Sequence, residues 1–266
     1  MAKPLSILRP FLVDHHILAV CKPAGLLSVP DATGDPSLVE LMGSWLRGAS
    51  SGAGHILSVH RLDRAVSGVV ILARTTKAAQ RLCAAFRSPD LVHKLYLART
   101  EPLAADSHLR ALCRDTPKGE VTVWMRHDGK NVVARTEPFE GARPARTRWA
   151  LHGWLADGSA QLELSPEGGK RHHLRTAAAV GLDAPLRGDT RYGARHGDSA
   201  ARGEVWLHAH VLAVPHPTAR SEDGMRQRLV TLSSEPGLDG RWQWDEAHCT
   251  PGQLVLEASP PDWWSG

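Results

Sequence analysis

Residues 60–73 read His-Arg-Leu-Asp-Arg-Ala-Val-Ser-Gly-Val-Val-Ile-Leu-Ala, so a charged segment runs directly into an apolar one. The apolar run Val69–Ala73 is short and rich in branched side chains, and it predicts a buried strand. Just before it, Asp63 lies between Arg61 and Arg64, and neighbouring cations favour the ionised form of a carboxylate. Such a carboxylate can act as nucleophile or general base. By itself, the arrangement is also typical of a surface ion pair on a turn.

The composition indicates a globular protein with a mild basic bias. The chain has 266 residues and 28.9 kDa, enough for one large domain or two small ones, and its 42% of hydrophobic residues argues against disorder. A net charge of +4 and a pI near 9.0 fit a polyanionic partner. No apolar stretch approaches the roughly 18 residues that span a bilayer, and residues 1–10 lack a signal-peptide core. We therefore expect a cytoplasmic protein without membrane contact.

The metal-binding residue types show no metal-site spacing. The four cysteines form no C-x-x-C pair, which argues against a disulfide framework and a structural zinc site. Among the fifteen histidines, the pairs at 15–16, 172–173 and 208/210 are candidate ligands for a metal hydrolase. No H-E-x-x-H motif occurs, however, and adjacent residues of a strand point to opposite faces. We therefore predict no metal site.

Local patterns predict an α+β chain in which most strands are antiparallel. The dipeptides Asp128-Gly129 and Asp157-Gly158 lie between apolar runs and predict two β-hairpins. A single α+β domain is the expected architecture. The hairpins are expected over 121–135 and 149–164, further strands at 17–20, 69–73, 92–99, 205–214 and 228–232, and helices after Ser37, after Thr75 or Thr76, and over 170–180.

Several further segments match, in chain order, the motifs of one enzyme family. They are Asp14–Gly25 with its Lys22-Pro23-Ala24-Gly25 turn, Val92–Ala98, Gly169–Arg175, Pro185–Gly193, Leu207–Ala209 and His216-Pro217. Together with residues 60–68, these blocks resemble the RluA-type pseudouridine synthases, which isomerise selected uridines in RNA without a cofactor. The resemblance covers roughly residues 7–217.

The resemblance implies a pseudouridine synthase fold, with a mixed, mainly antiparallel central sheet flanked by helices and an RNA-binding cleft. Residues 1–217 are expected to form the catalytic domain, without the small RNA-binding domain that precedes it in some members. Residues 218–266 are expected to be a C-terminal extension packed on the same domain. The implied partner is structured ribosomal or transfer RNA, or both, and a monomer that uses no nucleotide cofactor is expected.

The resemblance also implies the chemistry of the site. Asp63 is the implied catalytic carboxylate, and Arg175 is the arginine that pairs with it. Tyr96 is expected to pack under the target base and to assist proton removal at carbon 5 of the uracil. Asp63 either adds to the anomeric carbon of the ribose or removes the proton at carbon 2 to form a glycal. The sequence leaves both routes open.

RNA binding is predicted for side chains in the same motifs. The family implicates the arginine that stands here as Arg61 in base flipping, since a planar guanidinium can stack and hydrogen-bond in the space of the extruded base. His60, Arg64, Lys94 and His172 are also predicted to contact RNA.

Two segments with aromatic residues lie outside the motifs. Arg143, Arg146 and Arg148 beside Trp149 can track a phosphate backbone, although most such runs are solvated faces. The tryptophans of the C-terminal extension are expected to anchor it to the core. They are Trp242, Trp244, Trp263 and Trp264.

Three positions depart from the family pattern. Val66 stands where threonine is usual, His173 replaces the usual glutamine, and Ala177 takes a position commonly occupied by histidine. None of these changes removes a proposed catalytic group, so we expect an active enzyme with an altered rate or substrate choice.

A non-catalytic RNA-binding protein on the same fold is the main alternative. It predicts loss of Asp63, Tyr96 or Arg175, and all three are present. The string His-Arg-Leu-Asp also occurs in the catalytic loop of protein kinases, but Gly68 stands where that loop needs asparagine. The sequence therefore favours an RNA pseudouridine synthase.

Overall fold

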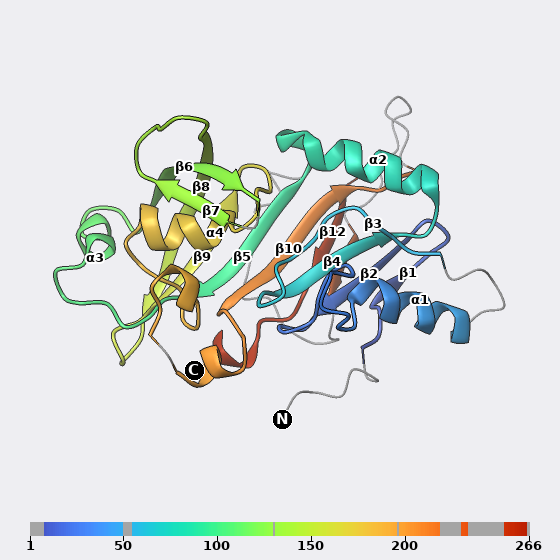
Figure 1. The fold of residues 1–266 in the computed structure, drawn as a ribbon, viewed down its shortest axis with the longest axis horizontal. Coiled ribbons are helices and arrows are strands. Elements are labelled where there is room, and N and C mark those ends of the chain that lie inside the picture. Colours follow the sequence, from blue (N-terminus) through green and yellow to red (C-terminus); the bar gives the residue numbers. More distant parts are fainter. Residues whose placement is uncertain are drawn as a thin grey trace. The chain divides into compact units, whose positions relative to one another are not determined.

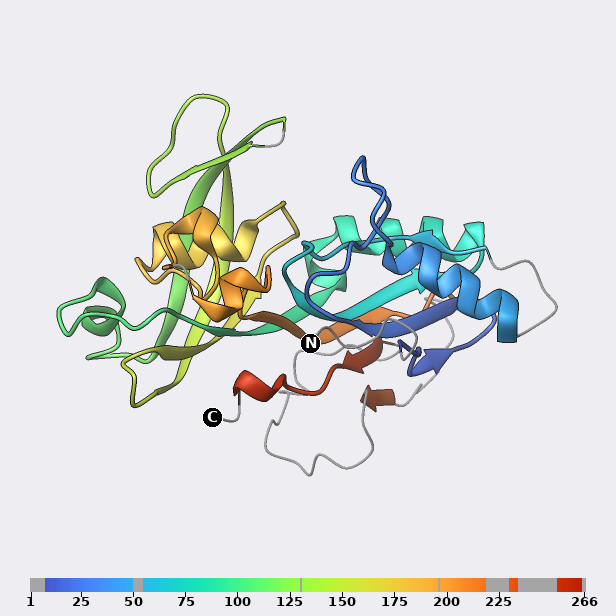
Figure 2. The same cartoon turned by 60° about the horizontal axis from the view of Figure 1, so that its bottom comes forward.

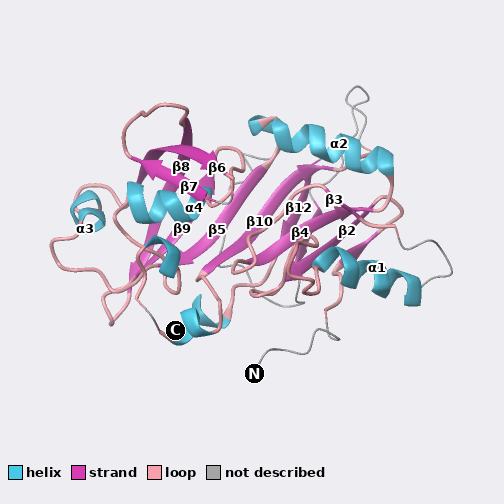
Figure 3. Cartoon of the chain, viewed as in Figure 1, coloured by secondary structure: helices cyan, strands magenta, loops and turns pink. Residues whose placement is uncertain are grey.

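The computed structural model of the chain describes residues 8–49, 55–129, 131–195, 197–218, 230–233 and 253–264. These residues belong to two units that interleave along the sequence. Unit 1 comprises Met1–His93 and Ala209–Ser259, and unit 2 comprises Lys94–His208 and Pro260–Gly266. In the described part of the chain, strands predominate over helices in both units (Figures 1 and 3).

The sheet of unit 1 is built on the two apolar runs of the N-terminal motifs. Strand β2 (Ile17–Lys22) pairs antiparallel with β4 (Ser67–Ala73), and nearly all of their side chains are buried. β1 (Leu12–Val13) pairs with β2, and β3 (Leu57–Ser58) pairs with β4, again antiparallel. The two strands predicted from hydrophobicity are therefore confirmed as the core of this unit.

The C-terminal strands complete this sheet beside β4. β10 (Leu207–Pro215) is the neighbour of β4 and pairs antiparallel with β12 (Gln253–Glu257). β12 pairs in parallel with β11 (Val230–Ser233), so the sheet is mixed but mainly antiparallel, as expected. At Gly68 an added Cβ would lie only 2.3 Å from the carbonyl oxygen of Ala209, and the glycine φ is +122°. This close approach explains why glycine follows the charged motif.

Two helices of unit 1 lie on one face of its sheet (Figure 2). α1 (Leu38–Ala49) begins after the predicted cap Ser37, which forms a reciprocal capping box with Glu40. α2 (Thr76–Arg87) begins after Thr75, whose side chain accepts a hydrogen bond from the first turn. Both predicted helices and caps are confirmed. One 3-10 turn, Pro89–Leu91, follows α2.

Unit 2 contains an antiparallel sheet that includes both predicted hairpins. The hairpin around Gly129 and the hairpin around Gly158 are confirmed, and their strands are longer than the apolar patterns indicated. In spatial order the strands are β5 (His93–Arg99), β9 (Ala160–Pro166), β8 (Arg143–Trp154), β6 (Lys118–Asp128) and β7 (Asn131–Arg135).

The helix predicted over 170–180 begins later than expected. α4 (His173–Thr176) is followed by a π-helical segment, Ala177–Gly181, and both pack on the sheet of unit 2. His172 has a left-handed conformation with φ +58°, which an α-helix cannot contain, so the helix starts only after it. An apolar run in the sequence does not distinguish an α-helix from a π-helix. Further helical segments of unit 2, among the described residues, are α3 (His108–Leu112), Thr190–Tyr192, α5 (Asp198–Ala201) and Asp262–Trp264.

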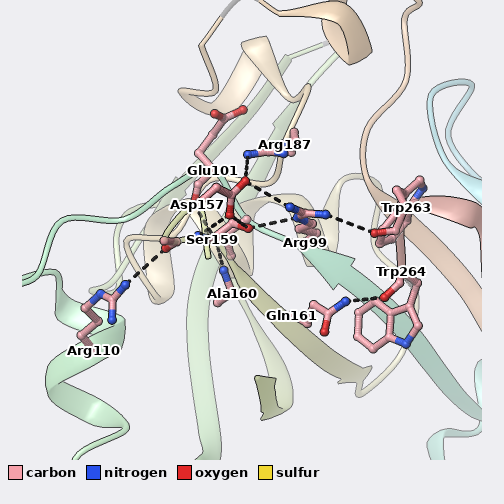
Figure 4. A network of polar contacts seen from close by, with 12 residues as sticks. Arg99, Glu101, Arg110, Asp157, Ser159, Ala160, Gln161, Arg187, Trp263 and Trp264 are labelled. Atoms are coloured by element: carbon pink, nitrogen blue, oxygen red, sulfur yellow. Dashed lines mark hydrogen bonds and ion pairs between the residues drawn. The ribbon is translucent and has the colours of Figure 1, made fainter. Parts of the chain in front are cut away.

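The last described residues of the chain dock on unit 2 (Figure 4). The ring of Trp263 stacks on that of Trp206 with centroids 5.3 Å apart, and Arg99 donates a hydrogen bond to the Trp263 carbonyl at 3.3 Å. Gln161 donates to the carbonyl of Trp264, whose side chain is buried. The anchoring predicted for these two tail tryptophans is therefore confirmed.

The remainder of the predicted C-terminal extension is described only in part. β11 and β12 belong to the sheet of unit 1, whereas the helical turn Asp262–Trp264 belongs to unit 2. Trp242 and Trp244 lie outside the described residues. The division into a catalytic domain over 1–217 and an extension over 218–266 stays a prediction.

Candidate active site

Asp63 lies in unit 1, on the loop that connects β3 to β4. Its side chain is half-buried, whereas the flanking Arg61 and Arg64 are exposed. The Asp63 carbonyl accepts a hydrogen bond from Val66 N–H at 3.0 Å, which closes a tight turn just before β4 begins. We call residues 60–66 the aspartate loop.

A fully buried lysine lies beside this loop. Lys22 ends β2, and its Nζ donates to the carbonyls of Pro23, Leu26 and Arg64 at 3.0, 2.8 and 3.3 Å. These three acceptors match the three protons of an ammonium group. Burial lowers the pKa of Lys22 to about 7, and the negative charge of Asp63 opposes that shift. Lys22 therefore ties the Lys-Pro-Ala-Gly turn to the aspartate loop.

Arg64 joins the same two segments from the solvent side. Its Nε donates to the Gly25 carbonyl at 3.0 Å, and Gly25 N–H donates to the Arg64 carbonyl at 2.8 Å. Its Nη1 forms an ion pair with Asp35 at 2.6 Å, with both side chains about half exposed. These contacts place Arg64 in the architecture of the loop, and its predicted RNA contact stays a prediction.

His60 opens the aspartate loop and is held by the elements behind it. Its Nε2 accepts a hydrogen bond from Ile71 N–H of β4 at 3.0 Å. Its ring stacks on Phe86 of α2, with centroids 4.6 Å apart and an interplanar angle of 20°. An imidazole that accepts through Nε2 carries its proton on Nδ1. These positioning contacts were not visible in the sequence, which suggested only RNA binding for His60.

Tyr96 and Lys94 lie in unit 2, on the same face of β5. Tyr96 is half-buried and stands opposite Leu164 of β9. Lys94 Nζ donates to the Gly168 carbonyl at 2.9 Å, and burial lowers the pKa of Lys94 to about 8. Lys94 thereby fixes the turn that leads to α4, and its predicted RNA contact is not tested by this geometry.

Arg175 projects from α4 and is clamped by a residue that sequence reasoning did not single out. Its Nε and Nη2 donate to the two carboxylate oxygens of Asp189 at 2.7 and 2.6 Å, a bidentate pair in which the side chains are 10% and 1% exposed. The guanidinium also lies over the ring of Tyr192, 5.2 Å from its centroid. Asp189 and Tyr192 belong to a quoted motif, but the motif did not indicate their partner.

His172 completes this arrangement in unit 2. Its ring is buried, and its Nδ1 lies 2.7 Å from the hydroxyl of Tyr192. The next residue, His173, places its Nε2 3.1 Å from the hydroxyl of Thr147. Burial, together with the positive charges of Lys170 and Lys94, lowers the pKa of His173 to about 4. His173 is therefore neutral at physiological pH.

The arginine-rich segment of β8 offers cations but no aromatic platform. Arg143, Arg146 and Arg148 are exposed, and the last two lie 4.0 and 3.7 Å from Glu167. Trp149 is only 5% exposed and packs against Gly119, so in this structure its ring is covered by the protein. RNA contact by this segment stays a prediction.

The predicted site residues thus form two groups. His60, Arg61, Asp63 and Arg64 are brought together in unit 1, and Lys94, Tyr96, His172 and Arg175 belong to unit 2. The pairing of Asp63 with Arg175 stays a prediction. Among the described residues, no three His, Cys, Asp or Glu side chains lie close enough to hold a metal ion.

The profile of the RNA pseudouridylate synthase family matches residues 16–179, a range that contains Asp63, Tyr96 and Arg175. The dual-specificity RNA pseudouridine synthase RluA of Escherichia coli K12 is 32% identical over 215 residues, which cover 79% of this chain and 89% of the relative. The chain belongs to the RNA pseudouridylate synthase family. It is therefore an RNA pseudouridine synthase, an isomerase that modifies RNA, and the resemblance seen in the motifs is confirmed.

A further sequence relative and two solved structures are also similar to this pseudouridine synthase. RluA of Haemophilus ducreyi is 29% identical over 233 residues, covering 86% of this chain and 95% of the relative. Among solved structures, human RNA pseudouridylate synthase domain containing 4 has a TM-score of 0.63 at 19% identity and covers 96% and 90% of the two chains. Human RNA pseudouridylate synthase domain containing 1 has a TM-score of 0.61 at 23% identity, covering 82% and 83%. The predicted fold class is confirmed.

A helix that spans a bilayer must be both long and predominantly apolar. In the part of the chain that the structure describes, no helix is both long and apolar enough to cross a bilayer.

Proposed function

We propose that this pseudouridine synthase isomerises selected uridines in structured ribosomal or transfer RNA, or both, with Asp63 as its catalytic carboxylate. The observation that carries this assignment is the aspartate loop. It presents a half-buried carboxylate beside the fully buried Lys22, and hydrogen bonds to the neighbouring turn hold its backbone.

The main chemical group that the reaction requires from the protein is a well-placed carboxylate. The bond between N1 of uracil and the anomeric carbon breaks, the uracil turns, and a bond forms between that carbon and C5. The proton on C5 leaves and N1 gains one, so the product is an isomer of the substrate. No oxidant, reductant or group donor is required, and the protein supplies acid–base or nucleophilic chemistry together with positioning.

Asp63 takes the central role in this proposal. It either adds to the anomeric carbon or removes the proton at ribose carbon 2, and in both routes it later reverses its own step. Arg175 pairs with the Asp63 carboxylate, while Asp189 holds Arg175 by its Nε and Nη2 edge. Tyr96 stacks on the uracil and assists the loss of the C5 proton.

Arg61 acts on the RNA rather than on the bond that breaks. Its exposed side chain stands at the start of the aspartate loop, one residue from Leu62 and two from Asp63. A guanidinium in that place can occupy the space of an extruded base and stack on its former neighbours, which offsets a few kcal/mol of unstacking cost. His60, Arg64, Lys94 and His172 support this RNA contact.

The relatives bear on which RNA this chain modifies. The bacterial relatives at 32% identity are named dual-specificity RNA pseudouridine synthases, which supports more than one RNA target for this chain as well. The net charge of +4 supplies a mild general attraction for any RNA, so selection among targets depends on shape and on flipped bases.

A genetic comparison tests this function. The gene is deleted, and pseudouridine is mapped across total ribosomal and transfer RNA by carbodiimide-dependent primer extension. We expect one or more positions to lose pseudouridine, to regain it with the wild-type gene, and to stay unmodified with Asp63→Asn. Restoration by Asp63→Asn would refute the catalytic assignment, and an unchanged map would refute the proposed substrates.

A further inference from the structure

The hydroxyl of Ser28 holds the backbone of the residue that precedes Asp63. Ser28 Oγ donates to the Leu62 carbonyl at 2.7 Å, and Leu62 N–H donates back to Ser28 Oγ at 3.1 Å. Ser28 is 5% exposed and Leu62 is 7% exposed, and the two are 34 positions apart in the sequence. Ser28 follows the Lys-Pro-Ala-Gly turn and lies in no strand or helix.

This contact fixes peptide planes rather than side chains. Leu62 N–H belongs to the peptide plane between Arg61 and Leu62, and the Leu62 carbonyl belongs to the plane between Leu62 and Asp63. A single hydroxyl therefore restrains both planes, as a neighbouring strand would. The plane after Asp63 is restrained by the hydrogen bond from Val66 N–H to the Asp63 carbonyl. Asp63 is thus held by its backbone on both sides.

Because this contact is buried, its loss would leave backbone groups without hydrogen-bond partners. Leu62 lies outside the regular strands, so without the hydroxyl its buried N–H and carbonyl lose these partners, and the loop must shift to find others. A shift of about 1 Å in a reacting group is enough to slow a reaction about 100-fold, because the chemistry depends on near-attack geometry. The position of the Asp63 carboxylate then depends on Ser28.

We propose that Ser28 is a positioning residue for the isomerisation, and that its hydroxyl sets where the Asp63 carboxylate meets the ribose. This inference rests on the proposed catalytic role of Asp63. It adds Ser28, which lies between β2 and α1. None of the site assignments above includes Ser28.

The chain offers a matched control for a purely structural role. Thr100 in unit 2 is buried as well, its Oγ1 donates to the Glu101 carbonyl at 2.7 Å, and the same Oγ1 accepts from Ala160 N–H at 2.9 Å. Like Ser28, it therefore bridges a backbone carbonyl and a backbone N–H that are both in loops or at strand ends. Its two hydrogen-bond partners, Glu101 and Ala160, are not among the residues to which we assign a catalytic role.

The test compares Ser28→Ala and Thr100→Val with the wild-type protein. The substrate is ribosomal and transfer RNA from the gene-deletion strain, tritiated at uracil carbon 5, and tritium release is followed with enzyme in excess. We expect Ser28→Ala to lower the single-turnover rate constant about 10- to 100-fold, with RNA affinity changed less than about threefold. Thr100→Val should lose comparable stability to urea and keep the wild-type rate within about twofold.

Two further variants keep the outcome unambiguous. Ser28→Thr retains the hydroxyl and should recover most of the rate lost in Ser28→Ala. If Ser28→Ala does not fold, Ser28→Cys, which keeps a weak donor and acceptor of similar size, should still show a slowed chemical step with normal RNA binding. A wild-type rate in folded Ser28→Ala or Ser28→Cys would overturn the inference, as would an equal loss of rate in Thr100→Val.

Failure of this inference can be told from failure of the proposed function. Asp63→Asn is measured in the same tritium-release assay. If Asp63→Asn is inactive and Ser28→Ala is fully active, Ser28 has no positioning role and the catalytic assignment stands. If Asp63→Asn releases tritium at the wild-type rate, the proposed function itself fails.

Discussion

The buried imidazole of His173 makes the stability of the fold depend on pH. Its Nε2 lies 3.1 Å from the hydroxyl of Thr147, and burial with nearby Lys170 and Lys94 lowers its pKa to about 4. In the unfolded chain a histidine takes up its proton at a pH near 6.5. The unfolded state therefore binds more protons between these two values, and the folded state loses stability as the pH falls through that window.

We predict that His173→Gln makes the protein less sensitive to acid. The glutamine amide can still hydrogen-bond to Thr147 but takes up no proton. Between about pH 7 and about pH 4.5, the wild-type free energy of unfolding should fall by on the order of 1–2 kcal/mol more than that of the variant. Urea unfolding at both pH values measures this. As a control for the substitution itself, His108→Gln makes the same change at an exposed side chain and should alter the free energy of unfolding at pH 7 by less than about 0.5 kcal/mol. Equal acid sensitivity of wild type and His173→Gln would contradict the assignment.

The ion pair between Arg175 and Asp189 yields a second prediction for single residues. Asp189→Ala leaves a guanidinium that is 10% exposed without its bidentate carboxylate, and such a loss costs about 3–5 kcal/mol. Asp157→Ala also removes a carboxylate from two arginines, Arg99 and Arg187, but Asp157 is 36% exposed and should cost less than about 2 kcal/mol. Urea unfolding of both variants decides this. A larger loss in Asp157→Ala would mean that burial does not govern these pairs.

The sequence identified the chemistry-bearing residues but not their supports. Asp63, Tyr96 and Arg175 could be named because each lies in a short motif with a fixed spacing. Ser28 and Asp189 act through contacts that span 34 and 14 positions, and such contacts depend on how loops close in three dimensions. No local pattern encodes which hydroxyl or carboxylate meets a given backbone group or guanidinium.

Elements were predictable where hydrophobic periodicity or capping residues are local. β2, β4, both hairpins and the caps of α1 and α2 were expected and are present. The start of α4 was not, because it depends on the left-handed His172, which packs against Tyr192. The tertiary environment overrides local preference there, a pattern common at functional sites.

The close approach of β4 and β10 at Gly68 gives a prediction for these elements. Gly68→Ala places a Cβ 2.3 Å from the Ala209 carbonyl oxygen in a conformation that only glycine adopts readily. We expect a loss of more than about 3 kcal/mol of stability or an insoluble protein. Gly153→Ala in β8 meets no atom within 4 Å and should change stability by less than about 1 kcal/mol. Equal stability of the two variants, measured by urea unfolding, would contradict the close packing of these strands.

At the scale of the whole molecule, the chain passes from unit 1 to unit 2, back to unit 1 and again to unit 2. The chain builds unit 2 with residues 94–208, contributes β11 and β12 to unit 1, and returns to unit 2 with its last residues. There the stack of Trp263 on Trp206 and the hydrogen bond from Arg99 fix the end of the chain (Figure 4). The helical turn Asp262–Trp264 is therefore part of unit 2.

We predict that Trp263→Ala destabilises unit 2. Loss of the stacked ring removes apolar contact and should lower the free energy of unfolding by about 2–4 kcal/mol. Relative to wild type, amide hydrogen exchange should speed up more in β5 and β9 than in β2 and β4. Trp263→Phe keeps an aromatic ring against Trp206 and should lose less than half as much. Unchanged exchange in β5 and β9 would show that the terminus is not part of this unit's stability.

The central claim is that Asp63 performs the isomerisation on RNA. The most direct measurement is pseudouridine formation by purified wild-type protein and by Asp63→Asn, on ribosomal and transfer RNA from the gene-deletion strain, with RNA binding and urea stability measured in parallel. We predict that Asp63→Asn binds RNA within about threefold of wild type, remains folded and forms no detectable product. Pseudouridine formation by Asp63→Asn at a rate near that of wild type would contradict the account.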